Sequence, residues 1–411
     1  MRPLLLLSNG HGEDLSGALL GRELRRWGLA VEAMPLVGHG SAYRQEGIPV
    51  VGGRTREFST GGLGYTSLAG RLTELRQGQP AYLLRQLLWL WGQRGRYGLV
   101  VAVGDLVPVL AAWLMGRPAA VYLVAYSSHY EGRLRLPFPC GWLLRARCWR
   151  AIWSRDALTA ADLSGQLGRP VTFLGNPFLD LVAAAGERQG WAAGRQSLAL
   201  LPGSRLPEAA RNLSLMLRLL SHLPQALQDP ERLRLQAALV GALPAEAVAA
   251  LATPLGWHNE SAEGGDDGAT QVLRHGSLRL QLHWGRFARV LRGSDLVLSM
   301  TGTAAEQAVG LGLPVLQLAG GGPQFTAGFA EAQRRLLGPG VVCDPGGVGE
   351  EVTLRRSAEL AAALLARQGD PQVGPAWRCQ LQQLAEERIG APGGSNRLAA
   401  AIMDLTRTAP R

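Results

Sequence analysis

Short apolar runs alternate with stretches of helical periodicity along most of this 411-residue chain. Apolar runs of about four to eight residues bounded by turn residues are typical of buried strands, whereas apolar residues spaced three and four apart predict helices. This alternation predicts parallel sheets covered by helices on both faces. The predicted strands are 3–7, 31–37, 48–51, 99–103, 118–124, 151–153, 171–174, 197–201, 234–240, 278–283, 295–299, 313–318 and 341–343.

The stretches with helical spacing and the unpatterned stretches complete the prediction. Residues 52–64 are rich in glycine and predict a loop, and residues 256–276 are polar and acidic and predict a surface loop. The main predicted helices are 15–27, 69–91, 286–292, 349–367, 375–388 and 396–406.

The pattern is interrupted once, near the middle of the chain. Residues 181–196 are rich in alanine and glycine, and a new strand pattern starts directly after them, so we predict a hinge there. The expected fold class is α/β, with two Rossmann-like doubly wound domains facing a central cleft. The domains cover residues 1–180 and 195–390, and the last segment, 391–411, is a helix that is a candidate to pack back on the first domain.

Composition narrows the chemistry. At 47% hydrophobic residues the chain can bury a large core. Its basic excess consists entirely of arginine, so Schiff-base chemistry at a lysine and a P-loop lysine are excluded. The formal charge of +10 favours anionic partners such as nucleotides and anionic lipid surfaces. Nucleic acid is disfavoured, because no nucleic-acid-binding motif accompanies the charge.

The cysteines and the N-terminus indicate the compartment. Four scattered cysteines form no metal-binding cluster, which indicates free thiols of a reducing cytoplasm and no zinc site. The apolar run 4–7 is too short for a signal peptide, and no run reaches about 18 apolar residues. We therefore expect a cytoplasmic protein that reaches a membrane at most peripherally, on the inner face.

The first candidate site follows the strand at 295–299, in the sequence SMTGTAAE. Thr301, Gly302 and Thr303 offer hydroxyls and open backbone N–H groups at a predicted helix N-terminus, where unpaired donors and the helix dipole favour an anion. Glu306 lies one turn into that helix, where its carboxylate can accept hydrogen bonds from a ribose. The simpler alternative is an ordinary turn of an α/β domain.

Two more turns extend this candidate site. The strand at 313–318 ends in a run of glycines that lets backbone approach a ligand closely. The strand at 197–201 leads into a turn whose serine and arginine side chains can contact phosphate oxygens, the arginine with fork geometry. Together the turns predict a nucleotide diphosphate site. Its further residues are Gly203, Ser204, Arg205 and Glu208, the last one turn into the next helix, and Gly321, Gly322 and Gln324.

In the first domain, ionisable residues follow the predicted strands at 3–7 and 99–103. The turn after the first strand carries His11, Glu13 and Asp14, and its glycines 10, 12 and 17 leave space for a ligand. Asp105 follows the other strand. Open α/β sheets bind ligands at the carboxyl ends of their strands, so these four residues are candidates for a catalytic base. The turn lacks the GxGxxG pattern, and Asp14 has the alternative role of capping a helix.

A basic, aromatic segment lies at 133–156, where six arginines alternate with Trp142, Trp149 and Trp153. Such a segment suits the interface of an anionic membrane. The alternative is a partly buried helix whose arginines reach solvent.

These motifs resemble lipid-A-disaccharide synthase and, more closely, the lipid-A-disaccharide synthase-related proteins. The motifs are GHGEDLSGALL, LGNPFLD, LLPGSR and MTGTAAEQAVGLGLPV. The resemblance covers the whole chain and implies a GT-B fold and inverting, metal-independent transfer of a sugar from a UDP-sugar to a lipid acceptor, without a cofactor. It also places Ser204 and Arg205 at the donor diphosphate, Thr301, Gly302, Thr303 and Glu306 around the nucleotide, and Asp105 where the synthases carry a proposed catalytic base.

Donor-side residues match the family better than acceptor-side ones, although the glycine turn GGGPQFTAGFAEAQ also has a form that the synthases lack. The synthase opening is roughly GEASGD, whereas this chain has Gly12-Glu13-Asp14-Leu15-Ser16-Gly17, and its aspartate motif is reduced to GDLVP. A sugar-nucleotide site is therefore favoured over lipid A as the product. Two alternatives stay open: a sugar-nucleotide epimerase of the same fold, and a non-catalytic protein that binds a nucleotide sugar or a lipid.

Overall fold

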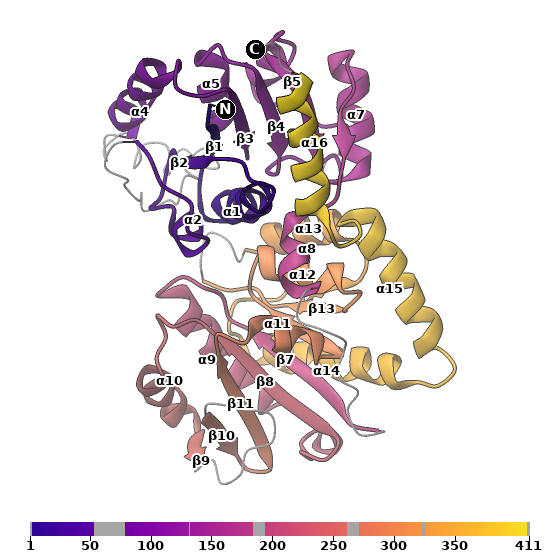
Figure 1. Cartoon of the computed structure of the whole chain (residues 1–411). Coiled ribbons are helices and arrows are strands. Elements are labelled where there is room, and N and C mark those ends of the chain that lie inside the picture. Colours follow the sequence, from indigo (N-terminus) through magenta and orange to yellow (C-terminus); the bar gives the residue numbers. More distant parts are fainter. Residues whose placement is uncertain are drawn as a thin grey trace. The chain divides into compact units, whose positions relative to one another are not determined.

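The chain forms two compact units in a computed structural model (Figure 1), which describes residues 2–52, 79–130, 132–183, 194–260, 271–321 and 326–408. Unit 1 comprises Met1–Asp180 and Gly390–Arg411, and unit 2 comprises Leu181–Ile389. Each unit has its own sheet and its own hydrophobic core.

The sheet of unit 1 is entirely parallel, with the order β2-β1-β3-β4-β5-β6. Val50 adds an isolated parallel bridge beside β2, at Ala33. Because the chain runs outward from β1 in both directions, the order reverses between β1 and β3, which is the position where open α/β sheets bind ligands. The strands are β1 (Leu4–Ser8), β2 (Val31–Pro35), β3 (Leu99–Val103), β4 (Ala119–Leu123), β5 (Trp149–Ser154) and β6 (Thr172–Phe173).

Helices cover both faces of this sheet, so consecutive leucines of β1 are all buried. Leu5 and Leu7 enter one core cluster, whereas Leu4 and Leu6 enter the other. Successive strand residues point to opposite faces, so a run without alternation requires both faces to be covered. The helices are α1 (His11–Arg26), α2 (Ser41–Gln45), α4 (Gln79–Gln93), α5 (Leu106–Leu114), α6 (Cys140–Leu143), α7 (Ala157–Leu167), α8 (Pro177–Ala183) and α16 (Gly394–Thr408).

The C-terminal helix α16 belongs to unit 1, although the chain reaches it only after completing unit 2. Its residues Leu398, Ala399 and Ile402 are fully buried in the same core cluster as Leu4 and Leu6. Asp180 fixes the entry to the helix by accepting hydrogen bonds from the backbone N–H groups of Gly393 and Ser395, at 2.5 and 2.8 Å.

Unit 2 has an eight-stranded sheet with the order β14-β13-β12-β7-β8-β11-β10-β9, parallel except where β10 pairs with β9 and β11. Here the order reverses between β7 and β12. The strands are β7 (Gln196–Leu201), β8 (Leu233–Leu239), β9 (His258–Glu260), β10 (Gln271–His275), β11 (Leu278–Trp284), β12 (Leu296–Ser299), β13 (Val315–Gln317) and β14 (Val341–Cys343).

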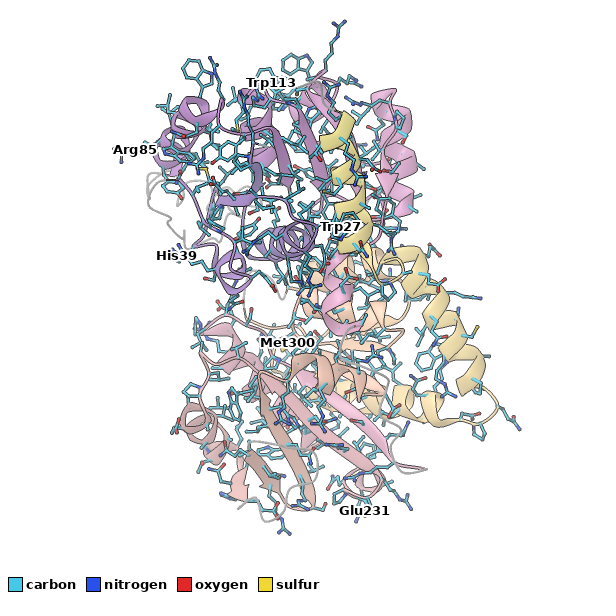
Figure 2. All side chains as sticks on the ribbon, viewed as in Figure 1. Trp27, His39, Arg85, Trp113, Glu231 and Met300 are labelled. Carbon is cyan, nitrogen blue, oxygen red and sulfur yellow. The ribbon has the colours of Figure 1, made fainter. Side chains whose placement is uncertain are left out.

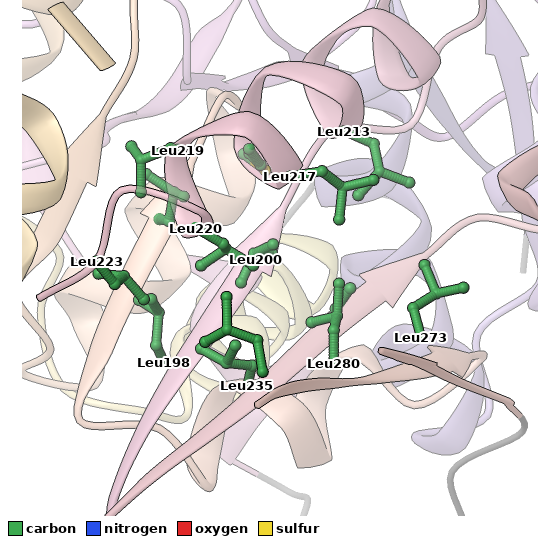
Figure 3. Close-up of a cluster of buried hydrophobic side chains, with 14 of the residues drawn as sticks. Leu198, Leu200, Leu213, Leu217, Leu219, Leu220, Leu223, Leu235, Leu273 and Leu280 are labelled. Carbon is green, nitrogen blue, oxygen red and sulfur yellow. The ribbon is translucent and has the colours of Figure 1, made fainter. Parts of the chain in front are cut away.

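The core of unit 2 is dominated by leucine (Figure 3). One face of α9 (Glu208–Leu220) contributes Leu213, Met216, Leu217 and Leu220 at helical spacing, and these residues pack on the strands around β7. The other helices are α10 (Ala245–Ala252), α11 (Phe287–Arg292), α12 (Thr303–Gly310), α13 (Ala327–Leu337), α14 (Glu351–Gly369) and α15 (Gly374–Arg388).

The predicted surface loop 256–276 is wrong, because β9 and β10 lie within it. These two strands form the antiparallel edge of the sheet, where one side of a strand can face solvent, so their sequences HNE and QVLRH need few apolar residues. The predicted start of the first helix is also wrong. Residues 11–14, taken as part of a turn, form the first turn of α1.

Other predictions are confirmed or fall partly outside the described residues. The strands at 99–103 and 341–343 have the predicted bounds. The helix predicted at 69–91 is described from Gln79, and the glycine-rich stretch 52–64 is described only at Gly52. All four cysteines are free. Within the described ranges, no helix is both long and apolar enough to cross a membrane.

Candidate functional site

In unit 2, the turns after β7 and β12 lie side by side. The backbone N–H of Met300 donates to the carbonyl of Leu201 at 3.0 Å, which continues the parallel pairing to the ends of both strands. Gly203 lies directly beside the second turn with φ 113, a conformation that favours glycine. The amide of Asn212, from α9, fixes the first turn by donating to the Pro202 carbonyl at 2.8 Å. The structure therefore brings together two turns that the sequence placed about 100 residues apart.

The residues predicted to contact a diphosphate are accessible. Ser204 and Arg205 are exposed at the tip of the turn after β7. Glu208, which was predicted one turn into the helix, is instead the first residue of α9, because the turn continues through Pro207. Exposed hydroxyl, guanidinium and backbone N–H groups at this end of a parallel sheet suit an oxyanion.

The predicted nucleotide residues after β12 are organised around the start of α12. The hydroxyls of Ser299 and Thr301 are 2.7 Å apart, which orients the Thr301 side chain. Gly302 precedes the helix without a side-chain cap, and Thr303 is its first residue, so backbone N–H groups of the first turn remain open. Glu306 lies in that first turn, as predicted, and only 7% of it is exposed.

A small hollow adjoins this turn. It is lined by Ser299, Met300, Thr301, Gln317, Leu318, Thr326, Phe329 and Ala330. Gln317 is buried at the end of β13, and its side-chain oxygen has no hydrogen-bond partner. Such an unsatisfied buried acceptor is costly, so it indicates a place where a ligand or water donates a hydrogen bond. Sequence analysis missed Gln317, although a polar residue in the apolar run VLQLA is a usable signal.

The glycine run after β13 is described only in part. Gly321 is exposed, and a side chain added there would meet no atom within 4 Å. Gly322 and Gln324 lie outside the described residues. Their predicted role at the nucleotide site stays a prediction.

In unit 1, buried polar groups lie at the carboxyl ends of β1 and β3. Tyr43, from α2, donates to the Ser8 hydroxyl at 2.8 Å, and Ser8 donates to the Asp14 carboxylate at 2.6 Å. All three side chains are buried. Burial raises the pKa of Asp14 to about 7, because the charged form loses its hydration and only part of it is replaced by the Ser8 hydrogen bond.

A second pair of carboxylates is joined by Asn9. The backbone N–H of Asn9 donates to Glu13 at 2.8 Å, and its side-chain amide donates to both oxygens of Asp105, at 3.1 and 3.3 Å. Asp105 also accepts the N–H of Val107 at 2.8 Å and so caps α5. Asn9 therefore holds together carboxylates that begin two different helices.

Burial shifts both carboxylates toward the protonated form. It raises the pKa of Glu13 well above the usual range, and the neighbouring charge of Asp105 adds to the effect. Burial also raises the pKa of Asp105, against the lowering effect of the hydrogen bonds from Val107 and Asn9. A carboxyl with a raised pKa is the stronger base once it has lost its proton, which is the property a general base needs.

Several expectations about this turn need correction. Asp14 does not cap α1, because it is the fourth residue of that helix and bonds Ser8, and the position before the helix is occupied by Gly10. Gly17 leaves no space for a ligand: a side chain there would lie 2.0 Å from the hydroxyl oxygen of Tyr43, so the tyrosine fills that space. His11 is the first residue of α1, but its side chain lies outside the described part of the structure.

Sequence analysis missed Ser8, Asn9 and Tyr43 as members of this cluster. Ser8 and Asn9 end the first apolar run, so a polar pair at a strand's carboxyl end was the available signal. Tyr43 gave no signal, because its role depends on α2 packing against α1 at Gly17.

The predicted basic, aromatic surface at 133–156 is not a single surface. Trp149 and Trp153 are buried on β5, with 2% and 3% exposed, whereas Trp142 on α6 is 61% exposed. The alternative of one partly buried helix is also wrong, since the segment contains the short α6 and the strand β5.

Other exposed apolar residues lie on α4 and at α6, two helices that each pack on α5. Leu84, Leu88 and Trp91 form an exposed stripe along α4, with 58%, 61% and 54% of each exposed, and Phe138 before α6 is 92% exposed. Trp113 of α5 contacts Trp142 edge-on at 5.7 Å between ring centroids. Arginines surround the stripe; Arg94 lies over the Trp91 ring at 4.3 Å, and Arg85 extends outward from α4 (Figure 2). We call this set the α4–α6 surface.

Across the described ranges, no group of three or more His, Cys, Asp or Glu side chains is arranged to hold a metal ion.

Solved structures share this architecture along nearly the whole chain. The spinosyn rhamnosyltransferase SpnG in complex with thymidine diphosphate gives a TM-score of 0.55 at 15% identity, covering 98% of this chain and 100% of that one. MurG from Acinetobacter baumannii gives 0.54 at 15% identity, covering 98% and 99%. MnaA from S. aureus with UDP gives 0.56 at 14% identity, covering 100% and 98%. The chain therefore has the GT-B fold of two Rossmann-like domains, as predicted; at these identities the likeness shows the fold alone.

The sequence itself is similar to lipid-A-disaccharide synthase, which confirms the resemblance seen in the motifs. The synthase of Solibacter usitatus (strain Ellin6076) is 28% identical over 252 residues, and the match covers 58% of each protein. The chain thus spans less than two thirds of this relative's length. No family model matches the chain.

Proposed function

We propose that this protein is an inverting, metal-independent glycosyltransferase that moves a sugar from a nucleotide sugar, with UDP as the nucleotide, to a lipid or lipid-linked acceptor. The observation that carries the proposal is the pair of carboxylates joined by Asn9 at the β1/β3 switch point. Unit 2 supports it with paired turns at its own switch point. The similarity to lipid-A-disaccharide synthase supports sugar transfer over other reactions of the fold.

On the donor side, Arg205 and Ser204 would bind the diphosphate together with the N-terminus of α9. Thr301, Gly302 and Thr303 would bind it at the N-terminus of α12, and Glu306 would accept hydrogen bonds from the ribose. As the bond between the sugar and the diphosphate breaks, negative charge develops on the leaving oxygen. Arginine and helix N-termini stabilise that charge without a metal ion.

On the acceptor side, Glu13 or Asp105 would act as the general base. The base removes the proton from the acceptor hydroxyl while that oxygen attacks the anomeric carbon from the side opposite the diphosphate, so the configuration inverts. Burial gives both carboxyls raised pKa values, and the base must be deprotonated before it can act. We therefore expect turnover to rise with pH, and to do so at a higher pH than the ordinary pKa of a carboxyl would give. His11 and Asp14 remain alternative bases, although Asp14 is engaged with Ser8.

The lipid acceptor would be reached through the α4–α6 surface, in place of the segment 133–156. Exposed leucines and aromatic rings flanked by arginines suit the interface of an anionic membrane. This would place the protein peripherally on the inner face of the membrane.

The testing experiment measures binding of UDP, UDP-sugars, and GDP- and ADP-sugars by calorimetry and thermal shift. We expect saturable binding of one UDP-sugar, weakened at least about tenfold by Arg205→Ala, since a charge-assisted contact to phosphate is lost. Arg211→Ala is the matched control, because Arg211 is an exposed arginine one turn further along α9. Absence of binding by every nucleotide sugar would overturn the proposal.

Two alternatives predict different behaviour with the same donor. The fold is shared with a Listeria monocytogenes protein described as a UDP-N-acetylglucosamine 2-epimerase, so fold does not separate transfer from epimerisation. An epimerase would convert the donor without any lipid, whereas a transferase needs an acceptor hydroxyl. A non-catalytic binding protein would bind the donor and show no turnover, whether or not a lipid acceptor is present.

A further inference from the structure

A second cavity lies in unit 2, away from the turns described above. It measures about 200 Å³ and is lined by Arg292, Leu311, Gly312, Leu313, Gln368, Arg378 and Gln382. These residues come from the ends of α11, α12 and α14 and from α15. Arg292 shortly precedes β12 and residues 311–313 shortly precede β13, so the cavity lies toward the amino ends of those strands, whereas the candidate nucleotide turns follow the carboxyl ends. Typical ligand pockets have about 300–1,000 Å³, so this cavity suits a small molecule.

Each of the two arginines of this cavity is held in place by hydrogen bonds from a single guanidinium nitrogen, Nη1. Nη1 of Arg292 donates to the carbonyl oxygens of Val182 and Ala183, at 3.1 and 3.4 Å. Nη1 of Arg378 donates to the Gln368 carbonyl at 2.6 Å. The Nε of Arg292 is buried and has no hydrogen-bond partner. Each guanidinium is therefore anchored through Nη1. The opposite Nε–Nη2 edge, which can bind an oxyanion with two parallel hydrogen bonds, makes no hydrogen bond to another described side chain or backbone group.

No acidic partner balances these charges among the residues the structure describes, because none of the ion pairs there includes Arg292 or Arg378. Two like charges lining one cavity repel each other, and an anion between them removes that repulsion.

The side chain of Gln368 adds a second requirement for a ligand of this cavity. It is 3% exposed, its side-chain amide donates to the Asp295 carbonyl at 3.2 Å, and its side-chain oxygen is buried without a partner. That oxygen needs a donor, which an oxyanion does not supply.

From these two requirements we infer that the cavity is a binding site for a small phosphorylated polyol. The phosphate would lie on the free edges of Arg292 and Arg378, and a hydroxyl of the same molecule would donate to Gln368. This inference does not rest on the proposed transferase activity, and it concerns neither the donor nor the acceptor of that reaction.

The test measures binding of glycerol 3-phosphate, inorganic phosphate and glycerol to the full chain by calorimetry at constant ionic strength. Glycerol 3-phosphate should bind saturably and more tightly than phosphate, because only it satisfies both the arginines and Gln368. Glycerol should not bind measurably. Absence of saturable binding of glycerol 3-phosphate up to tens of millimolar would overturn the inference, and so would equal affinity for phosphate.

Gln382→Glu locates the site without disturbing the fold, because Gln382 is an exposed residue of α15 at the cavity. A carboxylate there would pair with the arginines and repel the ligand, so we expect at least tenfold weaker binding of glycerol 3-phosphate. Gln383→Glu is the matched control, since it makes the same charge change one residue further along the exposed side of the helix. Arg205→Ala should leave this binding unchanged. Equal weakening by both glutamate variants, or loss of binding in Arg205→Ala, would show that the ligand binds elsewhere.

Discussion

At the scale of single residues, Asn9 explains why the candidate base can exist. It donates to Glu13 through the backbone and to Asp105 through the side chain, and these bonds keep the half-buried Glu13 and the buried Asp105 carboxylates at fixed positions. Without such donors, buried carboxylates would be held only in the protonated form, which cannot accept a proton. The network thus allows a raised pKa and an accessible charged state at the same site.

The buried carboxyl of Asp14 should make the free energy of unfolding decrease as the pH rises. Its pKa is about 7 in the folded protein, against 3.8 for an ordinary aspartate, so the folded state keeps a proton that the unfolded state releases. The free energy of unfolding should therefore fall as the pH rises from about 4 to about 7, by up to about 4 kcal/mol, and then level off. Urea unfolding of Asp14→Asn across this range should show that much of the decrease is gone. A decrease of the same size in the variant would contradict the assignment.

Gly104 is required by the same cluster. It follows β3 with φ 134, and a side chain there would lie 2.1 Å from a Glu13 carboxylate oxygen. We expect Gly104→Ala to displace Glu13, to lower the free energy of unfolding by about 2–4 kcal/mol, and to abolish turnover. The matched control is Gly116→Ala, which has a positive φ of 59 but open space around it, so it should cost only about 1 kcal/mol. Equal destabilisation of the two variants would show that the contact with Glu13 is unimportant.

The positions of candidate site residues were predictable from sequence only where an ionisable side chain follows an apolar strand. Glu13, Asp14 and Asp105 are acidic residues within six residues of the end of an apolar strand, and this pattern is visible in the chain. Tyr43 was not predictable, because its partner Ser8 belongs to a strand 35 residues earlier and the contact depends on how α2 packs. The alternative role of Asp14 as a helix cap is wrong, because Asp14 lies within the first turn of α1 and bonds Ser8.

At the scale of elements, α4 carries three exposed large apolar side chains, more than any other helix in the described part of the chain. Its buried positions include Leu90, yet Leu84, Leu88 and Trp91 are more than half exposed. A contiguous exposed apolar stripe is unusual in a monomeric protein and marks an interaction surface. The sequence suggested the wrong segment, because tryptophan and arginine alternate in 133–156 just as they do on an interfacial helix. In β5 the same alternation places Trp149 in the core and Arg150 in solvent.

The α4–α6 surface predicts membrane binding that depends on its leucines. Sedimentation with vesicles containing anionic lipid should fall at least about tenfold in the variant Leu84→Ser/Leu88→Ser, because burying each leucine contributes about 1.5–3 kcal/mol. The control is Leu158→Ser, which removes a leucine that is 45% exposed on α7 of the same unit. Binding that is unaffected by the double variant would exclude this surface as the membrane contact.

At the scale of the whole molecule, the chain repeats one arrangement twice. In each unit the strand order reverses next to the first strand, and the polar turns that follow the reversing strands come together there. The sequence predicted this arrangement because buried parallel strands appear as uninterrupted apolar runs. The prediction from apolar runs failed at β9 and β10, because antiparallel strands at the edge of a sheet do not need an uninterrupted apolar run. The apolar runs and the polar turns of the sequence do not predict how the turns of unit 1 and the turns of unit 2 would take part in one reaction.

The division of labour between the units can be tested directly, because it predicts opposite defects from two variants. Glu13→Gln/Asp105→Asn removes both candidate bases of unit 1, and we expect transfer to fall about 10²–10⁴-fold while the Kd for the nucleotide sugar stays within about twofold. Arg205→Ala in unit 2 should instead weaken donor binding at least about tenfold. Calorimetry of each variant with the donor, followed by turnover at saturating donor, separates the two effects.

Loss of donor binding in the carboxylate variant would mean that unit 1 holds the donor and would reverse the assignment. Unchanged turnover in that variant would exclude Glu13 and Asp105 as the base and leave His11 and Asp14 as the candidates.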